Sequence, residues 1–291
     1  MALAREQFLA VPGGRVLTMT YGDGSGIPLL ALHGGPGMPS YYLASLAELA
    51  DDRTVVLFDQ LGCGRSERPD DPSLWTVERA IAEVEAVRQA LRLETVHLLG
   101  HSWGGFLALA YARDHQENIA SLVLSSPLVS VSEWLQDAAD LIKQLPAATR
   151  NTIAVHEAEG AFDHPDYREA TMKFYRRFFC KLDPWPAELV QTFDEMGQQP
   201  YNVMWGPSEF TQTGNLRGLD LTATLRELEV PSLWLCGSQD EVSPARLWRY
   251  AVAAGGRAHV FVGGTHCVHL ESPAEYLRHV RAFLRSPDSR R

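Results

Sequence analysis

The sequence is poor in cysteine and has no long apolar run. Its four cysteines lie far apart and show no Cys-x-x-Cys spacing. Neither a disulfide framework nor a cysteine zinc site is therefore expected, and the pattern favours reduced thiols in a cytoplasmic protein. The longest apolar runs, such as residues 28–32, have the length of a strand and cannot span a bilayer. Residues 1–10 include charged side chains and lack the pattern of a signal peptide.

Basic residues are also in short supply. Lysine and arginine together number 26 against 36 aspartates and glutamates, which gives a formal net charge of −10 at pH 7. A nucleic-acid partner would need a basic surface, so that class of function is not expected. The composition, 45% hydrophobic and 21% charged, is typical of a globular enzyme. A length of 291 residues allows one large domain with an insertion or two ordinary domains. We expect a monomer or a small homo-oligomer.

Short apolar runs alternate with helical patterns along both ends of the chain. Buried strands are predicted at residues 29–33, 55–58, 95–99, 121–124, 232–236 and 258–262, and helices at residues 77–91, 103–113, 244–254 and 273–284. Thr76 is a candidate N-cap of the first helix, and the last two helices begin with proline. This alternation predicts an α/β fold with a mostly parallel central sheet flanked by helices.

The alternation stops in residues 127–221, which are predicted to be all-helical. We expect residues 1–126 and 222–291 to form the core domain and residues 127–221 to form a helical cap domain. The segment is rich in aromatic residues, most of which we expect to pack in its own core. A few of them could line an apolar pocket, because the insertion leaves the sheet at the carboxyl end of a strand, where open α/β sheets bind ligands.

The strongest chemical motif is Gly100-His101-Ser102-Trp103-Gly104, between a predicted strand and a predicted helix. In that setting Gly-x-Ser-x-Gly predicts a sharp turn that exposes Ser102 as a nucleophile. The helix that follows would place free N–H groups beside a developing oxyanion. The alternative is a glycine-rich turn that carries an incidental serine.

A nucleophilic serine needs a base and an acid that orients the base, and the chain order expected after such a turn is serine, then acid, then histidine. Asp240 comes directly after the strand at 232–236, and His266 follows the strand at 258–262. Both are therefore expected at the carboxyl edge of the sheet. Glu241 competes with Asp240 for the role of acid, and His269 competes with His266 for the role of base.

The run His33-Gly34-Gly35-Pro36-Gly37 follows another predicted strand. Adjacent glycines allow the backbone to approach a ligand, so the Gly35 amide is the expected second oxyanion donor, paired with the Trp103 amide. The run lacks the Lys-Ser/Thr of a phosphate-binding loop. The loop at residues 59–66 has too few glycines for a nucleotide-binding fingerprint and is interpreted as a brace for the serine turn.

Taken in order, these motifs resemble those of the prolyl aminopeptidase (proline iminopeptidase) family of α/β-hydrolases. That family includes tricorn-interacting aminopeptidases and some amino-acid amidases. The resemblance extends from about residue 29 to residue 276. Its matching segments are His33-Gly-Gly-Pro-Gly37, Asp59-Gln-x-Gly-x-Gly-x-Ser66, Gly100-x-Ser-Trp-Gly-Gly105, Asn202-Val-Met-Trp-Gly-Pro-Ser-Glu-Phe210, Asp240-Glu241 and the His266 loop with Glu271 behind it.

The resemblance implies an α/β-hydrolase fold and a recognition role for two glutamates. In such enzymes the residues corresponding to Glu209 and Glu241 bind the free α-ammonium group of the substrate. A buried cation needs paired carboxylates, which agrees with that role. The alternative for Glu209 is an exposed side chain of the cap without a binding role.

We therefore expect an aminopeptidase or amidase that acts on a small peptide or amino-acid amide with a free amino group. Ser102 is the nucleophile, His266 the general base and Asp240 the residue that orients it. No metal, cofactor, nucleic acid or membrane is expected to take part. An esterase or a biosynthetic acyl transferase with the same three residues is the nearest alternative, and a non-catalytic ligand receptor is the alternative of a different class.

Overall fold

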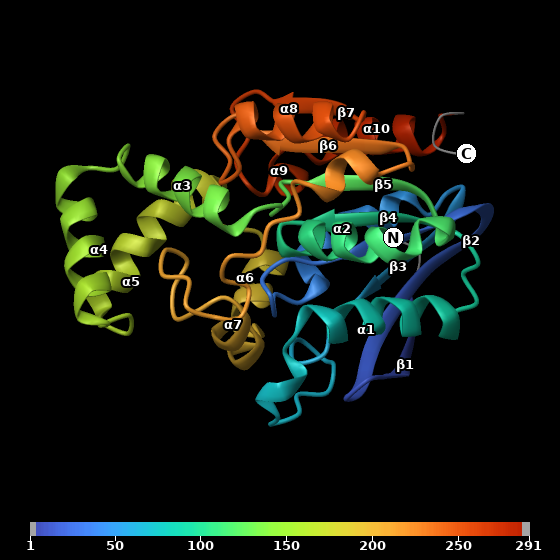
Figure 1. The fold of residues 1–291 in the computed structure, drawn as a ribbon, viewed down its shortest axis with the longest axis horizontal. Coiled ribbons are helices and arrows are strands. Elements are labelled where there is room, and N and C mark those ends of the chain that lie inside the picture. Colours follow the sequence, from blue (N-terminus) through green and yellow to red (C-terminus); the bar gives the residue numbers. More distant parts are fainter. Residues whose placement is uncertain (1–3, 287–291) are drawn as a thin grey trace.

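A seven-stranded sheet forms the centre of the molecule in the computed structural model, which describes residues 4–286 (Figure 1). The neighbouring strands β2, β4, β5, β6 and β7 pair in parallel, as the sequence predicts. The strands are β1 (Arg5–Val11), β2 (Gly14–Leu32), β3 (Arg53–Phe58), β4 (Val96–His101), β5 (Ile119–Ser125), β6 (Ser232–Gly237) and β7 (Arg257–Phe261).

The first strands were predicted only in part. Strand β1 pairs antiparallel with the start of β2, and β2 pairs with β3 on both sides of a bend. Thr18 lies opposite Phe58, whereas Leu29 lies opposite Val55, so β3 lies between the two parts of β2. The start of β2 has no long apolar run because the polar residues Arg15, Thr18 and Thr20 interrupt its apolar ones, although Thr18 is itself buried. From the sequence, therefore, only the apolar end of β2, at residues 29–32, was predicted as a strand.

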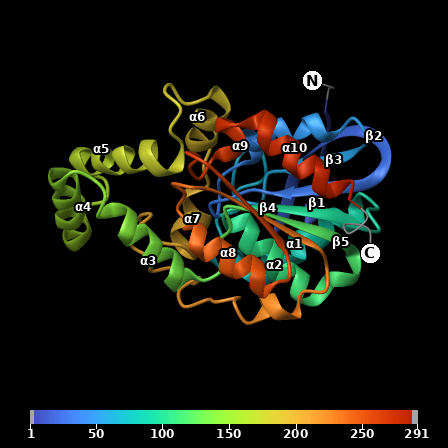
Figure 2. The same ribbon diagram turned by 90° about the horizontal axis from the view of Figure 1, so that it is seen from above.

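Helices cover both faces of the sheet (Figure 2). Leu30 and Leu98 point to the face that is covered by α1 (Val77–Ala90), α2 (Trp103–His115) and α8 (Pro244–Ala253). The neighbouring Leu29 and Leu99 belong to the apolar cluster of the opposite face, where η1 (Ser40–Leu49), α9 (Val268–Glu271) and α10 (Pro273–Leu284) pack. Because successive side chains of a strand alternate between faces, a continuous apolar run is what a sheet buried on both faces requires.

Two helices begin at the residues that the sequence predicts. The Thr76 hydroxyl accepts a hydrogen bond from the Arg79 amide at 3.2 Å and caps α1. Helix α10 begins at Pro273 and ends at Leu284, as predicted. No helix within residues 4–286 is long and apolar enough to cross a membrane.

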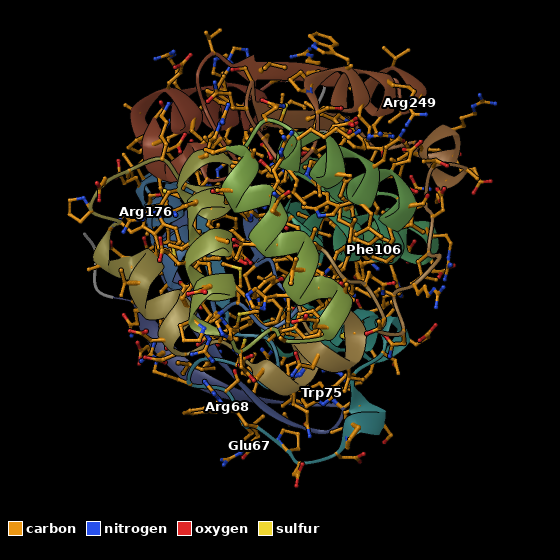
Figure 3. The ribbon with its side chains drawn as sticks, turned by 90° about the vertical axis from the view of Figure 1, so that its left-hand side faces the viewer. Glu67, Arg68, Trp75, Phe106, Arg176 and Arg249 are labelled. Carbon is orange, nitrogen blue, oxygen red and sulfur yellow. The ribbon has the colours of Figure 1, made fainter. Side chains whose placement is uncertain are left out.

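The chain between β5 and β6 forms helices that extend from one end of the sheet (Figure 1), and this end of the molecule faces the viewer in Figure 3. Part of this segment has an apolar cluster of its own, which includes Ile153, Tyr167 and Phe174. The boundaries predicted for a separate cap domain stay a prediction, and residues 1–3 and 287–291 of the predicted core domain lie outside the described residues. The helices of the segment are α3 (Val131–Ile142), α4 (Ala147–Glu159), α5 (Pro165–Phe174), the π-helical turn η4 (Tyr175–Phe179), α6 (Ala187–Asp194) and α7 (Gln198–Met204).

Candidate active site

Ser102 occupies a sharp turn between β4 and α2. Its backbone has φ +57° and ψ −120°, a conformation that costs a non-glycine residue about 1–3 kcal/mol and is typical of functional sites. The flanking glycines are required for space. A Cβ atom on Gly100 would lie 2.1 Å from the Gly104 carbonyl oxygen, and one on Gly104 would lie 2.1 Å from the Leu32 carbonyl oxygen. The strand and helix can therefore approach each other only with glycine at these positions.

Asp240 and His266 meet at the carboxyl ends of β6 and β7. The Nδ1 atom of His266 lies 2.8 Å from Oδ1 of Asp240, and both side chains are buried. Three further donors fix the carboxylate: the Ser126 hydroxyl at 2.6 Å and the Gly237 amide at 2.9 Å, both to Oδ2, and the Val242 amide at 3.3 Å to Oδ1. The carboxylate is thus held in one orientation toward the imidazole.

The two competing residues take other positions. His269 is buried against Tyr42 and His101, with ring centroids 5.3 and 4.9 Å away, and is not among the residues that line the cavity described below. Glu241 lies on the opposite side of the His266 ring from Asp240, with Oε2 3.8 Å from Nε2. Asp240, and not Glu241, therefore holds Nδ1.

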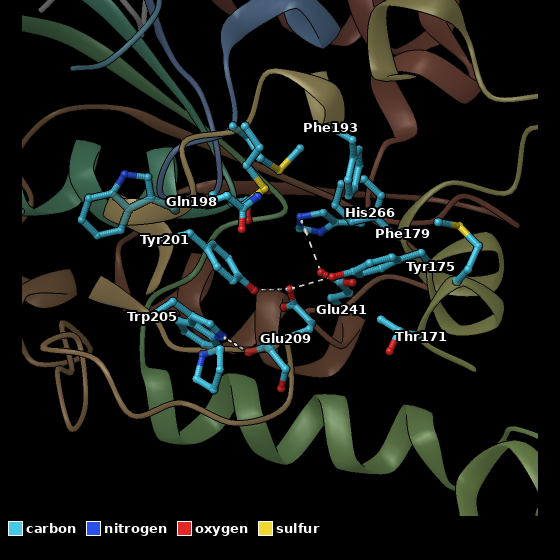
Figure 4. A pocket seen from close by; sticks show the side chains of 18 of the residues that line it. Thr171, Tyr175, Phe179, Phe193, Gln198, Tyr201, Trp205, Glu209, Glu241 and His266 are labelled. Atoms are coloured by element: carbon cyan, nitrogen blue, oxygen red, sulfur yellow. Dashed lines mark hydrogen bonds and ion pairs between the residues drawn. The ribbon is translucent and has the colours of Figure 1, made fainter. Parts of the chain in front are cut away.

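A cavity of about 350 Å³ lies between the sheet and the helical segment. Ser102, His266, Glu209 and Glu241 all line it (Figure 4). Many of the residues that line it are aromatic, and the helical segment provides seven of these: Trp134, Tyr167, Tyr175, Phe179, Phe193, Tyr201 and Trp205. Three of these residues belong to η4 and α7, two helical turns next to the cavity. The sequence predicted that some aromatics of this segment would face a pocket but could not identify them.

Gly35 and Trp103 border the same cavity beside Ser102. Gly35 has φ +112°, and a Cβ atom on the preceding Gly34 would lie 3.1 Å from the Ser102 Cβ. Trp103 is the first residue of α2, so its amide is one of those that helix geometry leaves without a partner inside the helix. Both positions agree with the predicted pair of oxyanion donors.

The loop that follows β3 braces this region, as the sequence suggested. The Gln60 side chain accepts a hydrogen bond from the Trp103 indole at 3.1 Å, and the Gln60 amide donates to His33 Nε2 at 2.8 Å. The Asp59 carboxylate accepts hydrogen bonds from the Ser40 amide and hydroxyl at 2.9 and 2.8 Å. The loop thereby connects the ends of β2, β3 and β4.

Glu209 and Glu241 stand at the cavity with different partners. The hydroxyls of Tyr201 and Tyr175 donate to Oε2 of Glu209 at 3.2 and 3.5 Å. Glu241 is 3% exposed, and its Oε1 has no hydrogen-bond partner among the described residues. Burial raises the pKa of both carboxyl groups, and the proximity of Glu209 raises that of Glu241 further, against the attraction of His266. Two desolvated carboxylates in one cavity form a site that favours a cation.

The comparisons with known proteins agree with this geometry. Residues 27–273 match the family model described as alpha/beta hydrolase fold. A proline iminopeptidase from Heyndrickxia coagulans is 41% identical over 97% of this chain and 99% of its own. The chain belongs to the proline iminopeptidase family of α/β-hydrolases. The predicted fold class and the resemblance seen in the motifs are both confirmed, and the chain is a hydrolase.

Two solved structures superpose over nearly the whole chain. The proline iminopeptidase of Mycobacterium smegmatis is 34% identical, with a TM-score of 0.90, and the match covers 98% of this chain and 99% of that one. The structure of VinJ is 30% identical with a TM-score of 0.92, over 96% of this chain and 98% of its own. The helical segment therefore lies within a fold that this chain shares with both structures from end to end.

A series of side-chain hydrogen bonds near the active site of this hydrolase was not predicted from the sequence. The Gly34 amide donates to the Tyr42 hydroxyl at 2.8 Å, that hydroxyl lies 2.9 Å from His101 Nδ1, and His101 Nε2 lies 3.1 Å from the His266 carbonyl oxygen. Tyr42 has one proton to donate, so His101 accepts it at Nδ1 and carries its own proton on Nε2. Burial, reinforced by the neighbouring His266, lowers the pKa of His101 and keeps it neutral in this role.

Replacing Tyr42 by phenylalanine is expected to lower kcat and leave KM nearly unchanged. The change unpairs the Gly34 amide and His101 Nδ1, which should also reduce the free energy of unfolding by about 1–3 kcal/mol. Tyr42 does not line the cavity, so substrate contacts are retained. Steady-state kinetics and chemical denaturation measure the two effects. The matched control is Tyr41→Phe, which removes only a hydroxyl that binds Glu195. Equal kcat values in both variants would refute the positioning role.

Removal of the Glu241 charge is expected to shift the pH dependence of hydrolysis. Burial disfavours the protonated imidazole, but Glu241 and Asp240 outweigh it and raise the pKa of His266 to about 9. A base with a raised pKa is protonated, and so inactive, below that pH. In Glu241→Gln the acid limb of kcat/KM for a neutral ester such as 4-nitrophenyl acetate should therefore move to lower pH, since kcat/KM reports the free enzyme. An acid limb that stays in place would contradict this.

Proposed function

We propose that this hydrolase is a serine aminopeptidase that releases the N-terminal residue, proline or another apolar residue, from small peptides or amino-acid amides. The observation that supports it best is the placement of Glu209 and Glu241 in the cavity that holds Ser102 and His266. A nucleophile beside a cation site suits a carbonyl that lies one carbon from a free ammonium group. The relatives named proline iminopeptidase suggest the same reaction.

In the acylation step, Ser102 Oγ attacks the carbonyl carbon of the first residue. His266 Nε2 takes the hydroxyl proton while Asp240 holds Nδ1–H and stabilises the imidazolium. The amides of Gly35 and Trp103 donate to the oxyanion, each contributing on the order of 3 kcal/mol to the transition state. The imidazolium then gives its proton to the leaving nitrogen, and the C–N bond breaks.

In the deacylation step, water attacks the ester between Ser102 and the first residue. His266 accepts a proton from the water and returns it to Ser102 Oγ as the ester bond breaks. Free amino acid and free enzyme result. The reaction requires only these side chains, the two backbone amides and water.

Glu241 and Glu209 select the free amino group. Desolvation makes each carboxylate costly to ionise alone, and a substrate ammonium between them compensates for that cost. An acylated nitrogen has neither the charge nor the three donors of an ammonium. Such a substrate would leave the two carboxyl groups without a counter-ion, so it is bound poorly.

The aromatic walls of the cavity suit an apolar first residue. Phe179, Tyr175 and Trp134 offer flat apolar surface near His266, with Phe179 and Trp134 at ring-centroid distances of 5.2 and 5.6 Å from it. A proline ring would bury its methylene groups there at a gain of about 0.8 kcal/mol each. The free, buried state of all four cysteines agrees with action in a reducing cytoplasm, which we include in the proposal.

A panel of aminoacyl 2-naphthylamides tests the proposal. We expect the highest kcat/KM for prolyl or another apolar residue and little turnover of acidic first residues. A 4-nitrophenyl ester without an amino group serves as the comparison. Rapid turnover of the ester together with no turnover of any aminoacyl amide would favour the esterase or acyl transferase instead.

A further inference from the structure

We propose that His259, Glu275 and His279 form a binding site for a divalent transition-metal ion of the zinc type. His259 lies on the edge strand β7, and the other two lie one turn apart on α10, which packs beside that strand (Figure 1). These residues are not among those that line the active-site cavity. The site is therefore independent of the proposed peptidase reaction.

The three ligand atoms form a triangle of suitable size. Oε1 of Glu275 lies 3.8 Å from His259 Nε2 and 4.0 Å from His279 Nε2, and all three atoms lie within 4.8 Å of one another. The centre of a triangle with sides of about 4 Å is roughly 2.3 Å from each corner. Zinc–nitrogen and zinc–oxygen bonds are about 2.0–2.2 Å long. Rotation of the two imidazoles out of their stacked arrangement would therefore bring all three atoms to bonding distance.

The scaffold beneath these side chains is rigid. The imidazoles of His259 and His279 stack at 3.8 Å, and both contact the buried Phe261 ring, at 4.7 and 5.7 Å. Val280, next to His279 on α10, is fully buried. Ligands on a packed strand and helix lose little freedom when they bind an ion. At 32%, 45% and 32% exposure, the side chains of His259, Glu275 and His279 remain open to solvent, with room for a water ligand.

The chemistry of the donors also suits a metal. The Nε2 atom of His259 is buried and has no hydrogen-bond partner among the described residues, although buried polar atoms normally have one. Two imidazoles and a carboxylate are a known zinc ligand set. Arg278 Nη2, 3.8 Å from Oε1 of Glu275, is the cation that an incoming ion would displace.

Two other groups of ligand-type residues within the described chain are less suitable. His164 of the group on α4 and α5 already accepts the Asp166 amide at Nδ1, at 3.2 Å. In the buried group, both nitrogens of His101 take part in the hydrogen bonds to Tyr42 and to the His266 carbonyl. His156 Nδ1 of the first group is also buried without a hydrogen-bond partner among the described residues, but its neighbour His164 already accepts a backbone hydrogen bond, whereas Glu275 lies within 4.0 Å of both imidazoles of its group.

Calorimetric titration of the full chain, without a histidine tag, with zinc chloride tests the site. We expect one ion per chain, and His259→Ala or His279→Gln should weaken binding at least about tenfold, since loss of even an outer-shell partner costs about 10- to 100-fold. Both substitutions are at partly exposed positions, and hydrolysis without zinc should be unchanged. His164→Ala is the matched control and should bind zinc as the unchanged protein does.

Three outcomes would overturn the site: no zinc binding, a zinc affinity of His259→Ala and His279→Gln equal to that of the unchanged protein, or loss of binding only in His164→Ala. If zinc instead binds at His266, it would inhibit hydrolysis, and this binding would be retained in His259→Ala and His279→Gln. Parallel activity assays with zinc therefore separate that outcome from the proposed site, and the comparison does not depend on which substrate the enzyme prefers.

Discussion

Replacing Ser102 by alanine is expected to reduce kcat by about a million-fold, the loss seen when the nucleophile of a comparable triad is removed. The Cβ atom is retained, so the strained turn can form as before. The Ser102 backbone also keeps its bonds, which include its amide to the Ser125 carbonyl at 3.0 Å. The thermal midpoint should therefore change little. Labelling by a fluorophosphonate, which requires an activated serine, should disappear.

The control for this prediction is Ser126→Ala. Ser126 donates to Asp240 and to the His266 carbonyl, but it lies behind the acid and does not line the cavity. Its loss should slow labelling without preventing it. Persistent labelling of Ser102→Ala at the wild-type rate would place the nucleophile elsewhere. The absence of labelling in the unchanged protein would instead support a non-catalytic receptor.

Changing Glu241 to glutamine is expected to weaken transition-state binding of free-amine substrates by about 2–5 kcal/mol, because it leaves a buried ammonium without its partner. This corresponds to a loss of about 30- to 5,000-fold in kcat/KM. The two side chains have nearly the same size, and Glu241 Oε1 has no hydrogen bond that the substitution would break. The loss would therefore report charge rather than shape. Steady-state kinetics with an aminoacyl naphthylamide measure it.

Two controls accompany that variant. Glu195→Gln changes a carboxylate that does not line the cavity and should leave kcat/KM unchanged. Hydrolysis of 4-nitrophenyl acetate by Glu241→Gln should not fall, since that ester has no ammonium group. If Glu241→Gln hydrolyses free-amine substrates like the unchanged enzyme, Glu241 does not bind the amino group.

Much of the site was predictable because it follows directly from the ends of strands. Ser102 and Asp240 follow the buried strands β4 and β6, and His266 follows β7, an edge strand of which only Phe261 is buried. Parallel strands bring such ends to one edge of the sheet. Ser126 obeys the same rule, since it directly follows β5, between the strands that carry the serine and the acid. From this position alone, Ser126 could have been predicted as a residue of the active site.

Other features depend on contacts that no local pattern shows. Tyr42 lies in η1, where an apolar pattern indicates only burial, yet its hydroxyl joins Gly34 to His101. The hairpin of β1 with the start of β2 is only partly buried, so its sequence alternates weakly. The aromatics that face the cavity are likewise selected by how the helices pack. Tyr175 and Phe179, for example, begin and end a single π-helical turn.

Selection of a free amino group is the central claim, and the ratio of kcat/KM for prolyl 2-naphthylamide to that for N-acetylprolyl 2-naphthylamide tests it most directly. If the enzyme prefers another first residue, the free and the N-acetylated naphthylamide of that residue are compared instead. We predict that the free amine is favoured by at least about 30-fold, the lower limit for loss of a buried charge pair. Equal turnover of the free and the acetylated substrate would contradict the assignment of Glu209 and Glu241 and, with it, the aminopeptidase function.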